Sequence, residues 1–271
     1  MALEFERMFG TGKPVIAMVH FAAMPGSPLF NKAAGVEGMV EAAKRDLEAL
    51  QRAGVDAVMF GNENDRPYEL KVDAATVATM AYCIGRLAEE IDVPFGVNVL
   101  WDPKASISVA VASGASFVRE IFTGTYASDM GNWSPNAGEA LRYRDRLGGD
   151  GIKVFFNISA EFAYSLDRRS VADRARSAVF SSVPDALLVS GTITGEPAAL
   201  NDLTAVKDAV PDVPVLANTG VKIETVAEVL SISDGVIVGS SLKVDGDTWN
   251  PVDEERATEF MNRARAARNK I

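Results

Sequence analysis

Residues 213–243, VPVLANTGVKIETVAEVLSISDGVIVGSSLK, contain the pattern that decides the fold. Two short apolar runs, at 213–217 and 236–238, are typical of buried strands. Between them, apolar residues recur at helical spacing from 222 to 231. A strand, a helix and a second strand in this order predict a parallel βαβ unit.

Both apolar runs end in small residues that suit an anion. These residues are Asn218, Thr219 and Gly220 after the first run, and Gly239, Ser240 and Ser241 after the second. The backbone N–H groups of such turns, and the positive end of a following helix dipole, attract negative charge. In eight-stranded α/β barrels the loops after strands seven and eight are the usual phosphate site. We therefore expect these turns, together with Thr192 and Gly195, to hold the phosphate of a substrate.

Six further apolar runs precede this unit and alternate with amphipathic segments. They lie at 15–19, 55–60, 93–99, 117–122, 152–158 and 186–189. The chain has 271 residues, close to the roughly 250 of a typical barrel. Eight strand-helix alternations predict a single-domain (β/α)8 TIM barrel over 1–271, with 1–13 as an N-terminal lead-in and 252–271 as a C-terminal helix.

Composition restricts the partners. The net charge of −10 argues against nucleic acid and against anionic membrane surfaces. Cys83 is the only cysteine, so no internal disulfide is possible and a reducing, cytoplasmic location is expected. No apolar run approaches 18 residues and no secretory signal is recognisable, so no membrane span is expected. A homo-oligomer is expected because symmetric assembly is common.

Several segments resemble the BtpA/SgcQ family. They are VIAMVHFAAMPGSPLF at 15–30, GVNVL at 96–100, VSGTITG at 189–195 and DGVIVGSSLKVDG at 234–246. The resemblance is closer to the SgcQ-like branch at MFGNENDRPY, REIFTGTYASDMGNW and FNISAEFA. It implies a TIM barrel of the ribulose-phosphate-binding type. One branch is named for photosystem I biogenesis and the other is associated with sugar-utilisation gene clusters.

The resemblance does not carry over catalytic roles. The BtpA branch has a Glu-Asn pair after strand two and a Lys-His pair after strand five. Here the corresponding positions hold Gly61-Asn62 and Glu161-Phe162.

The active sites of such barrels lie at the carboxyl ends of the strands, where two polar groups stand out early in the chain. His20, the single histidine, ends the first strand and is either a general acid or base or a hydrogen-bonded residue of the rim. Glu63, with Asn62 and Asp65, follows the second strand. This group either binds sugar hydroxyls, a cation or a proton in transfer, or forms a turn before Pro67.

Charged and amide side chains also lie on the third and fourth strands. Asn98 is a candidate site residue, and Asp102 either joins it or caps the next helix. Arg119 and Glu120 are adjacent charges in a strand buried on both faces, where a charge needs a partner. Because adjacent strand residues face opposite sides, one is expected at the barrel mouth and the other toward the helices.

The remaining candidates follow the fifth strand or lie in a long loop. Asn157 is polar on an apolar strand, and Glu161 follows it. Residues 123–135 form either a lid or a subunit contact. A Mg²⁺ or Mn²⁺ site built from oxygen ligands is considered. Its candidate ligands are Glu63, Asp102, Glu120 and Glu161.

Absent residue types exclude other chemistry. No lysine ends a predicted strand on the active side, which disfavours a Schiff base. One histidine and one cysteine exclude a His₃ or cysteine-rich zinc site.

The sequence thus favours a cytoplasmic enzyme acting on a phosphorylated sugar or similar phosphometabolite, of isomerase, epimerase or lyase type. His20, Glu63, Asn98, Arg119, Glu120 and Asn157 are its expected catalytic residues. Two alternatives remain. One is a non-catalytic binding or assembly factor, and the other is a nucleoside or glycoside hydrolase that uses paired carboxylates.

Overall fold

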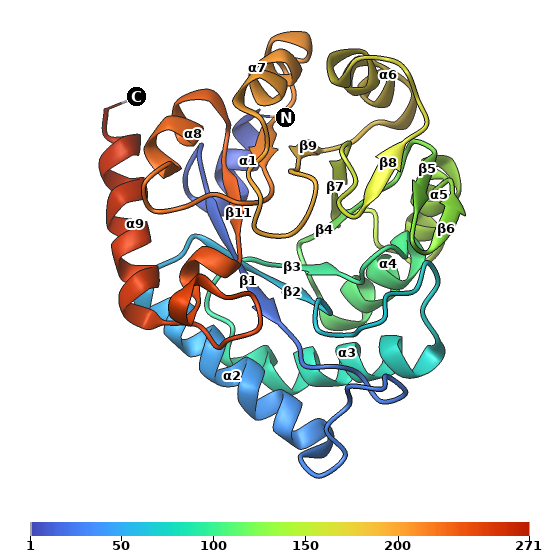
Figure 1. The fold of residues 1–271 in the computed structure, drawn as a ribbon, viewed down its shortest axis with the longest axis vertical. Coiled ribbons are helices and arrows are strands. Elements are labelled where there is room, and N and C mark those ends of the chain that lie inside the picture. The colour runs from blue at the N-terminus through green and yellow to red at the C-terminus, as the bar shows by residue number, and fades with distance from the viewer. Residues whose placement is uncertain (1, 271) are drawn as a thin grey trace.

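A closed barrel of parallel strands forms the centre of the computed structural model, which describes residues 2–270 (Figure 1). Its strands are β1 (Val15–His20), β2 (Ala57–Gly61), β3 (Phe95–Asn98), β4 (Phe117–Glu120), β7 (Lys153–Asn157), β9 (Ala186–Val189), β10 (Val215–Ala217) and β11 (Val236–Val238). They pair in the order β1-β11-β10-β9-β7-β4-β3-β2, and β1 pairs with β2 to close the ring. The predicted single-domain TIM barrel is confirmed, with β10 and β11 as its seventh and eighth strands.

Helices surround the barrel on its outer side (Figure 1). They are α2 (Gly35–Ala53), α3 (Ala74–Leu87), α4 (Pro103–Ser113), α5 (Ala137–Arg146), α6 (Val171–Ser182), α7 (Leu200–Ala209), α8 (Val226–Ile232) and α9 (Glu254–Arg268). The described residues also form the short 3₁₀ helices η1 (Ala88–Glu90), η2 (Ser240–Leu242) and η3 (Val244–Gly246). Within residues 2–270 no helix combines the length and apolarity needed to cross a membrane.

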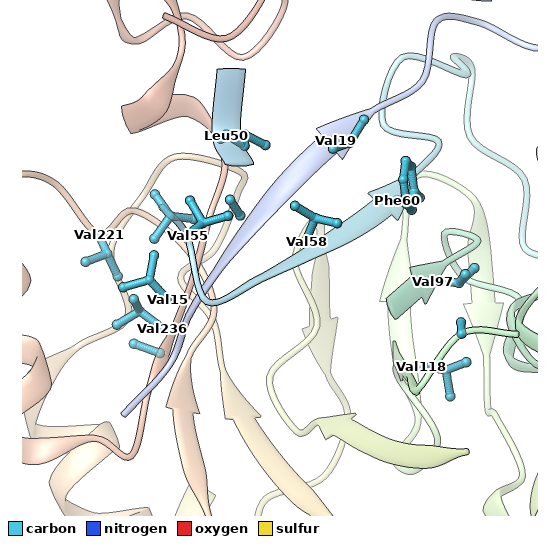
Figure 2. Packing of buried hydrophobic residues seen from close by; sticks show 14 of the residues in the cluster. Val15, Val19, Leu50, Val55, Val58, Phe60, Val97, Val118, Val221 and Val236 are labelled. Atoms are coloured by element: carbon cyan, nitrogen blue, oxygen red, sulfur yellow. The ribbon is translucent and has the colours of Figure 1, made fainter. Parts of the chain in front are cut away.

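Strand alternation divides the core into two layers. One set of side chains packs between strands and helices, as Figure 2 shows for Val19, Val58 and Leu50. The other set fills the barrel and includes Met18, Phe117, Phe155, Leu216 and Ile237. Since side chains alternate along a strand, the residue two positions after each interior residue faces the mouth. The residues placed in this way are His20, Arg119, Asn157, Asn218 and Gly239.

A helix closes the end of the barrel opposite this mouth. The predicted lead-in of residues 1–13 contains α1 (Ala2–Phe9), which the sequence analysis missed; Met1 lies outside the described residues. Phe5 and Phe9 pack against the interior ring of Phe155 and Phe117, at centroid distances of 6.0 and 5.7 Å. The helix therefore caps the apolar interior and leaves only the other end open to a ligand.

A small antiparallel sheet includes part of the predicted long loop at 123–135. Strands β5 (Tyr126–Ser128) and β6 (Gly131–Trp133) form a hairpin within residues 123–135, and β8 (Ala163–Ser165) pairs with β5. Trp133 stacks on Tyr126 at 4.7 Å and lies 5.9 Å from the ring of Trp101. The hairpin is thus packed onto the loop after β3.

Candidate functional site

The carboxyl ends of the strands enclose a cavity of about 630 Å³. The predicted residues that line it are His20, Glu63, Arg119, Glu161, Gly195, Asn218, Thr219, Gly220, Gly239, Ser240 and Ser241. These residues lie at the ends of strands or in the loops that follow them. In the sequence they are separated by up to 221 residues (from 20 to 241). Closure of the barrel therefore brings the predicted phosphate turns and several predicted acid-base residues to one cavity.

His20 and Glu63 form a buried pair in its wall. His20 Nε2 lies 3.6 Å from Glu63 Oε2. Burial raises the pKa of Glu63 to about 7, although the positive charge of Arg119 acts to lower it. Burial also holds the pKa of His20 well below its usual value, assisted by the positive charges of Lys243 and Arg119. At neutral pH the imidazole is therefore uncharged, and the carboxyl group is divided between its two protonation states.

Two glycines make room for this pair. A Cβ at Gly61, at the end of β2, would collide with the Glu63 carboxylate. A Cβ at Gly239 would lie 3.2 Å from His20 Cε1. Glu63 can therefore fold back over the end of its own strand, and the imidazole can approach the turn after β11.

Arg119 faces the cavity, as alternation allowed, and is neutralised by a carboxylate. Its Nη2 donates to Glu161 Oε1 at 2.9 Å, and its Nη1 donates to Asn98 Oδ1 at 2.5 Å. Glu161 Oε1 also accepts from Ser190 Oγ and Asn218 Nδ2, both at 3.1 Å. A buried ion pair with this many hydrogen bonds fixes both side chains in one arrangement.

Glu120 faces away from the cavity and binds the backbone. Its Oε1 accepts from Asn98 Nδ2 at 2.6 Å and from the Trp101 amide at 3.1 Å. Its Oε2 accepts from the Ile121 amide at 2.7 Å. Burial raises the pKa of Glu120 to about 7. These hydrogen bonds favour the ionised form and so act to lower the pKa. The carboxylate holds Trp101 in a left-handed backbone conformation, with φ of 70°.

Several other predicted residues do not line the cavity. These are Asn98, Asp102, Asn157 and Thr192. Asn157 Nδ2 donates to Ser190 Oγ at 2.9 Å, so it supports the network behind Glu161. Asp102 accepts from the amides of Lys104 and Ala105 and caps α4. This is the second of the two roles predicted for it.

The four candidate metal ligands occupy separate environments. Glu63 faces His20, Glu161 faces Arg119, Glu120 binds backbone amides and Asp102 caps a helix. Among residues 2–270 no group of three or more His, Cys, Asp or Glu side chains is placed to hold a metal ion. The predicted candidates therefore do not assemble into one metal centre.

The predicted phosphate turns meet along one wall of the cavity. Gly220 has φ of +63°, and a Cβ there would collide with the backbone of Glu196 in the loop after β9. A Cβ at Gly195, in the same loop, would lie 3.8 Å from Ser240 Oγ. Thr219 Oγ1 accepts from the Gly191 amide at 2.6 Å. The loops after β9, β10 and β11 are thus in direct contact, and they line the cavity with backbone and small side chains.

Three basic residues near this wall were missed, and one of them, Lys222 in the loop after β10, lines the cavity. Arg256 of α9 lines the cavity, and its Nε donates to Ser241 O at 3.3 Å. It lies one helical turn before the buried Phe260, so the helical period could have placed it on the inward face. Lys243, in the loop after β11, is only 2% exposed, and burial lowers its pKa. It lies behind the lining residues and ends no strand, so strand-end reasoning did not find it.

Fold and cavity together define a (β/α)8 barrel with a polar pocket at the carboxyl ends of its strands. The chain belongs to the BtpA family, whose sequence profile matches residues 11–266. It is 49% identical over 258 residues to the putative sgc region protein SgcQ of Escherichia coli strain K12, covering 95% of this chain and 96% of that protein. It is 30% identical to the photosystem I biogenesis protein BtpA of Synechocystis, covering 96% and 90%. The expected family resemblance is confirmed.

Solved structures agree on the fold. The N-(5'-phosphoribosyl)anthranilate isomerase of Pyrococcus furiosus superposes with a TM-score of 0.54 at 14% sequence identity, covering 93% of this chain and 99% of that chain. At this identity the similarity concerns the barrel alone.

Proposed function

We propose that this chain is a cytoplasmic enzyme that acts on a phosphorylated sugar or a similar phosphometabolite, by isomerisation, epimerisation or carbon–carbon cleavage. One observation carries the proposal. A single cavity of about 630 Å³ joins a wall of glycine and serine turns to a buried carboxyl group whose pKa is about 7.

The wall formed by Gly220, Gly239 and Ser240 is suited to a phosphate. In an acidic protein an anion must be held by local dipoles and nearby cations. The first amides of η2 have no carbonyl partner within that short helix, since its i→i+3 bonds begin with the amide of Leu242. Arg256 adds a guanidinium at the same wall. These groups supply both the dipoles and the charge.

The pair formed by Glu63 and His20 is suited to proton transfer. A general base works best when its pKa lies near the working pH, and the carboxyl group of Glu63 meets this condition. As carboxylate it can remove a proton from a carbon next to a carbonyl, and as carboxylic acid it can return one to the neighbouring atom. The uncharged imidazole of His20, 3.6 Å away, can hold the substrate oxygen that gains charge.

The test is ligand-dependent thermal stability. Sugar phosphates should raise the melting temperature by mass action, and the unphosphorylated sugars should not. Stabilisation by an unphosphorylated compound alone would overturn the proposal. An assembly factor, as the name of the Synechocystis relative suggests, would bind a protein and would keep its role in cells when Glu63 is replaced by Gln.

Replacing Arg256 by Gln should weaken binding of inorganic phosphate about tenfold, because one charge-assisted contact is lost. Calorimetric titration measures the change. Arg263→Gln is the matched control, since Arg263 lies on the exposed face of the same helix. Equal affinities in the two variants would remove Arg256 from the phosphate site.

A further inference from the structure

Four buried polar atoms in the cavity wall have no hydrogen-bond partner within residues 2–270. They are His20 Nδ1, Glu63 Oε2, Arg119 Nε and Asn218 Oδ1. Their side chains come from β1, the loop after β2, β4 and the turn after β10, and all four residues line the cavity. Since buried polar groups in folded proteins are nearly always bonded, this concentration points to groups that a ligand supplies.

The orientation of the Asn218 amide follows from its neighbours. Its Nδ2 donates to Ser190 Oγ at 2.6 Å and to Glu161 Oε1 at 3.1 Å, so both N–H bonds are in use. A flipped amide would turn its oxygen toward the Glu161 carboxylate, which only accepts. Oδ1 is therefore held as an acceptor for a ligand donor.

Arg119 offers the complementary group. Its two Nη atoms bind Asn98 and Glu161, which leaves the Nε–H as a donor. Because Glu161 neutralises the guanidinium, this part of the wall attracts a neutral oxygen rather than an anion.

A hydroxyl group has the chemistry that both atoms need, because it can accept from Arg119 Nε–H and donate to Asn218 Oδ1. A phosphate dianion has acceptor oxygens only, so it cannot donate to Asn218 Oδ1, and it would be repelled by the ionised form of Glu63 in the same cavity. An alkyl chain would leave all four polar atoms without hydrogen-bond partners. Each such atom makes the free energy of binding less favourable.

We infer that Asn218 is a specificity-determining residue, and that with Arg119 it binds a hydroxyl group of the ligand. The inference rests on the proposed phosphate site and makes it more specific. The preferred ligand is a polyhydroxylated monophosphate, in contrast to an alkyl phosphate or a bisphosphate with a second phosphate on its other end. The side chain of Asn218, expected from the sequence to serve the phosphate, is assigned to the hydroxylated part.

The test uses the unmodified protein and matched ligands. Thermal stabilisation first selects the tightest of a panel of pentose and hexose monophosphates. Calorimetry then compares this compound with an n-alkyl phosphate of equal carbon number and with the corresponding bisphosphate. The monophosphate is expected to bind at least tenfold tighter than either one, as one or two lost hydrogen bonds predict.

The outcomes separate this inference from the proposed function. Equal or tighter binding of the alkyl phosphate or the bisphosphate overturns the inference and leaves the phosphate site in place. Binding of no phosphorylated compound overturns both.

Asn218→Ala tests the residue itself, with Asn132→Ala on the exposed β6 strand as control. The variant should bind the selected sugar phosphate about tenfold more weakly and inorganic phosphate within twofold of the unmodified protein. Equal losses of affinity for both ligands would assign Asn218 to the phosphate site and overturn the inference. If the variant does not fold, the comparison of ligands on the unmodified protein still tests the inference.

Discussion

Glu63 and Glu120 are both buried, and burial raises the pKa of each to about 7. Their surroundings nevertheless differ. Glu63 lines the cavity, and its Oε2 has no hydrogen-bond partner within residues 2–270. Glu120 accepts from one side chain and two backbone amides, and it lies outside the cavity. A raised pKa therefore identifies a buried carboxyl group, whereas the bonding of its oxygens shows whether it can exchange a proton with a ligand.

The strongest test of this contrast is Glu63→Gln. Turnover of the sugar phosphate that stabilises the protein most should fall by a factor of roughly 100 to 10,000, because an amide cannot transfer the proton. Substrate affinity should change only a few-fold. Steady-state kinetics measure both, with Glu259→Gln on the exposed face of α9 as control. Unchanged turnover would show that Glu63 is not the acid-base group.

The pH dependence of stability is the second test. Well below pH 4.5, Glu63 is protonated in both the folded and the unfolded chain. As the pH rises, the unfolded chain ionises first, so the wild type loses stability until the pH passes the folded-state pKa of about 7. Relative to Glu63→Gln, the wild type should lose roughly 3 kcal/mol of unfolding free energy between pH 4.5 and pH 8.

Urea unfolding of both proteins at several pH values measures this difference. Glu120 is present in both proteins, so its own titration cancels in the comparison. A difference that does not vary with pH would mean that Glu63 ionises normally in the folded protein.

The smallest effect is expected from Glu120→Gln, and it concerns stability. Either orientation of the new amide turns an NH₂ group toward the amide of Trp101 or Ile121, both of which are donors. The unfolding free energy at pH 7 should fall by about 2 kcal/mol, while turnover per folded molecule is retained. Glu89→Gln on the surface serves as the control. A stable variant without turnover would give Glu120 the role that we assign to Glu63.

The eight barrel strands could be predicted because each is a short apolar run bounded by turn residues, and this signal is local. The small antiparallel sheet of β5, β6 and β8 could not be predicted in this way. Its β5 strand pairs with β8, which belongs to a different βα loop, so neither segment carries the pairing in its own sequence. Helix α1 was missed for a similar reason, since Phe5 and Phe9 are buried only by the bottom of the barrel.

The site shows the same division. Alternation along β4 predicted that Arg119 and Glu120 face opposite sides, and only the closed barrel shows that Arg119 faces the cavity. Arg256 joins the site from α9, which follows the last strand, so it lies outside the strand ends that were searched for site residues.

The sequence by itself determined the order of strands and helices, the turns of small residues after strands seven and eight, and the family, because all three are properties of neighbouring residues. The tertiary structure alone decided which polar groups share one cavity and which pKa values are shifted. Those properties depend on burial and on distances between residues that approach one another only when the barrel closes.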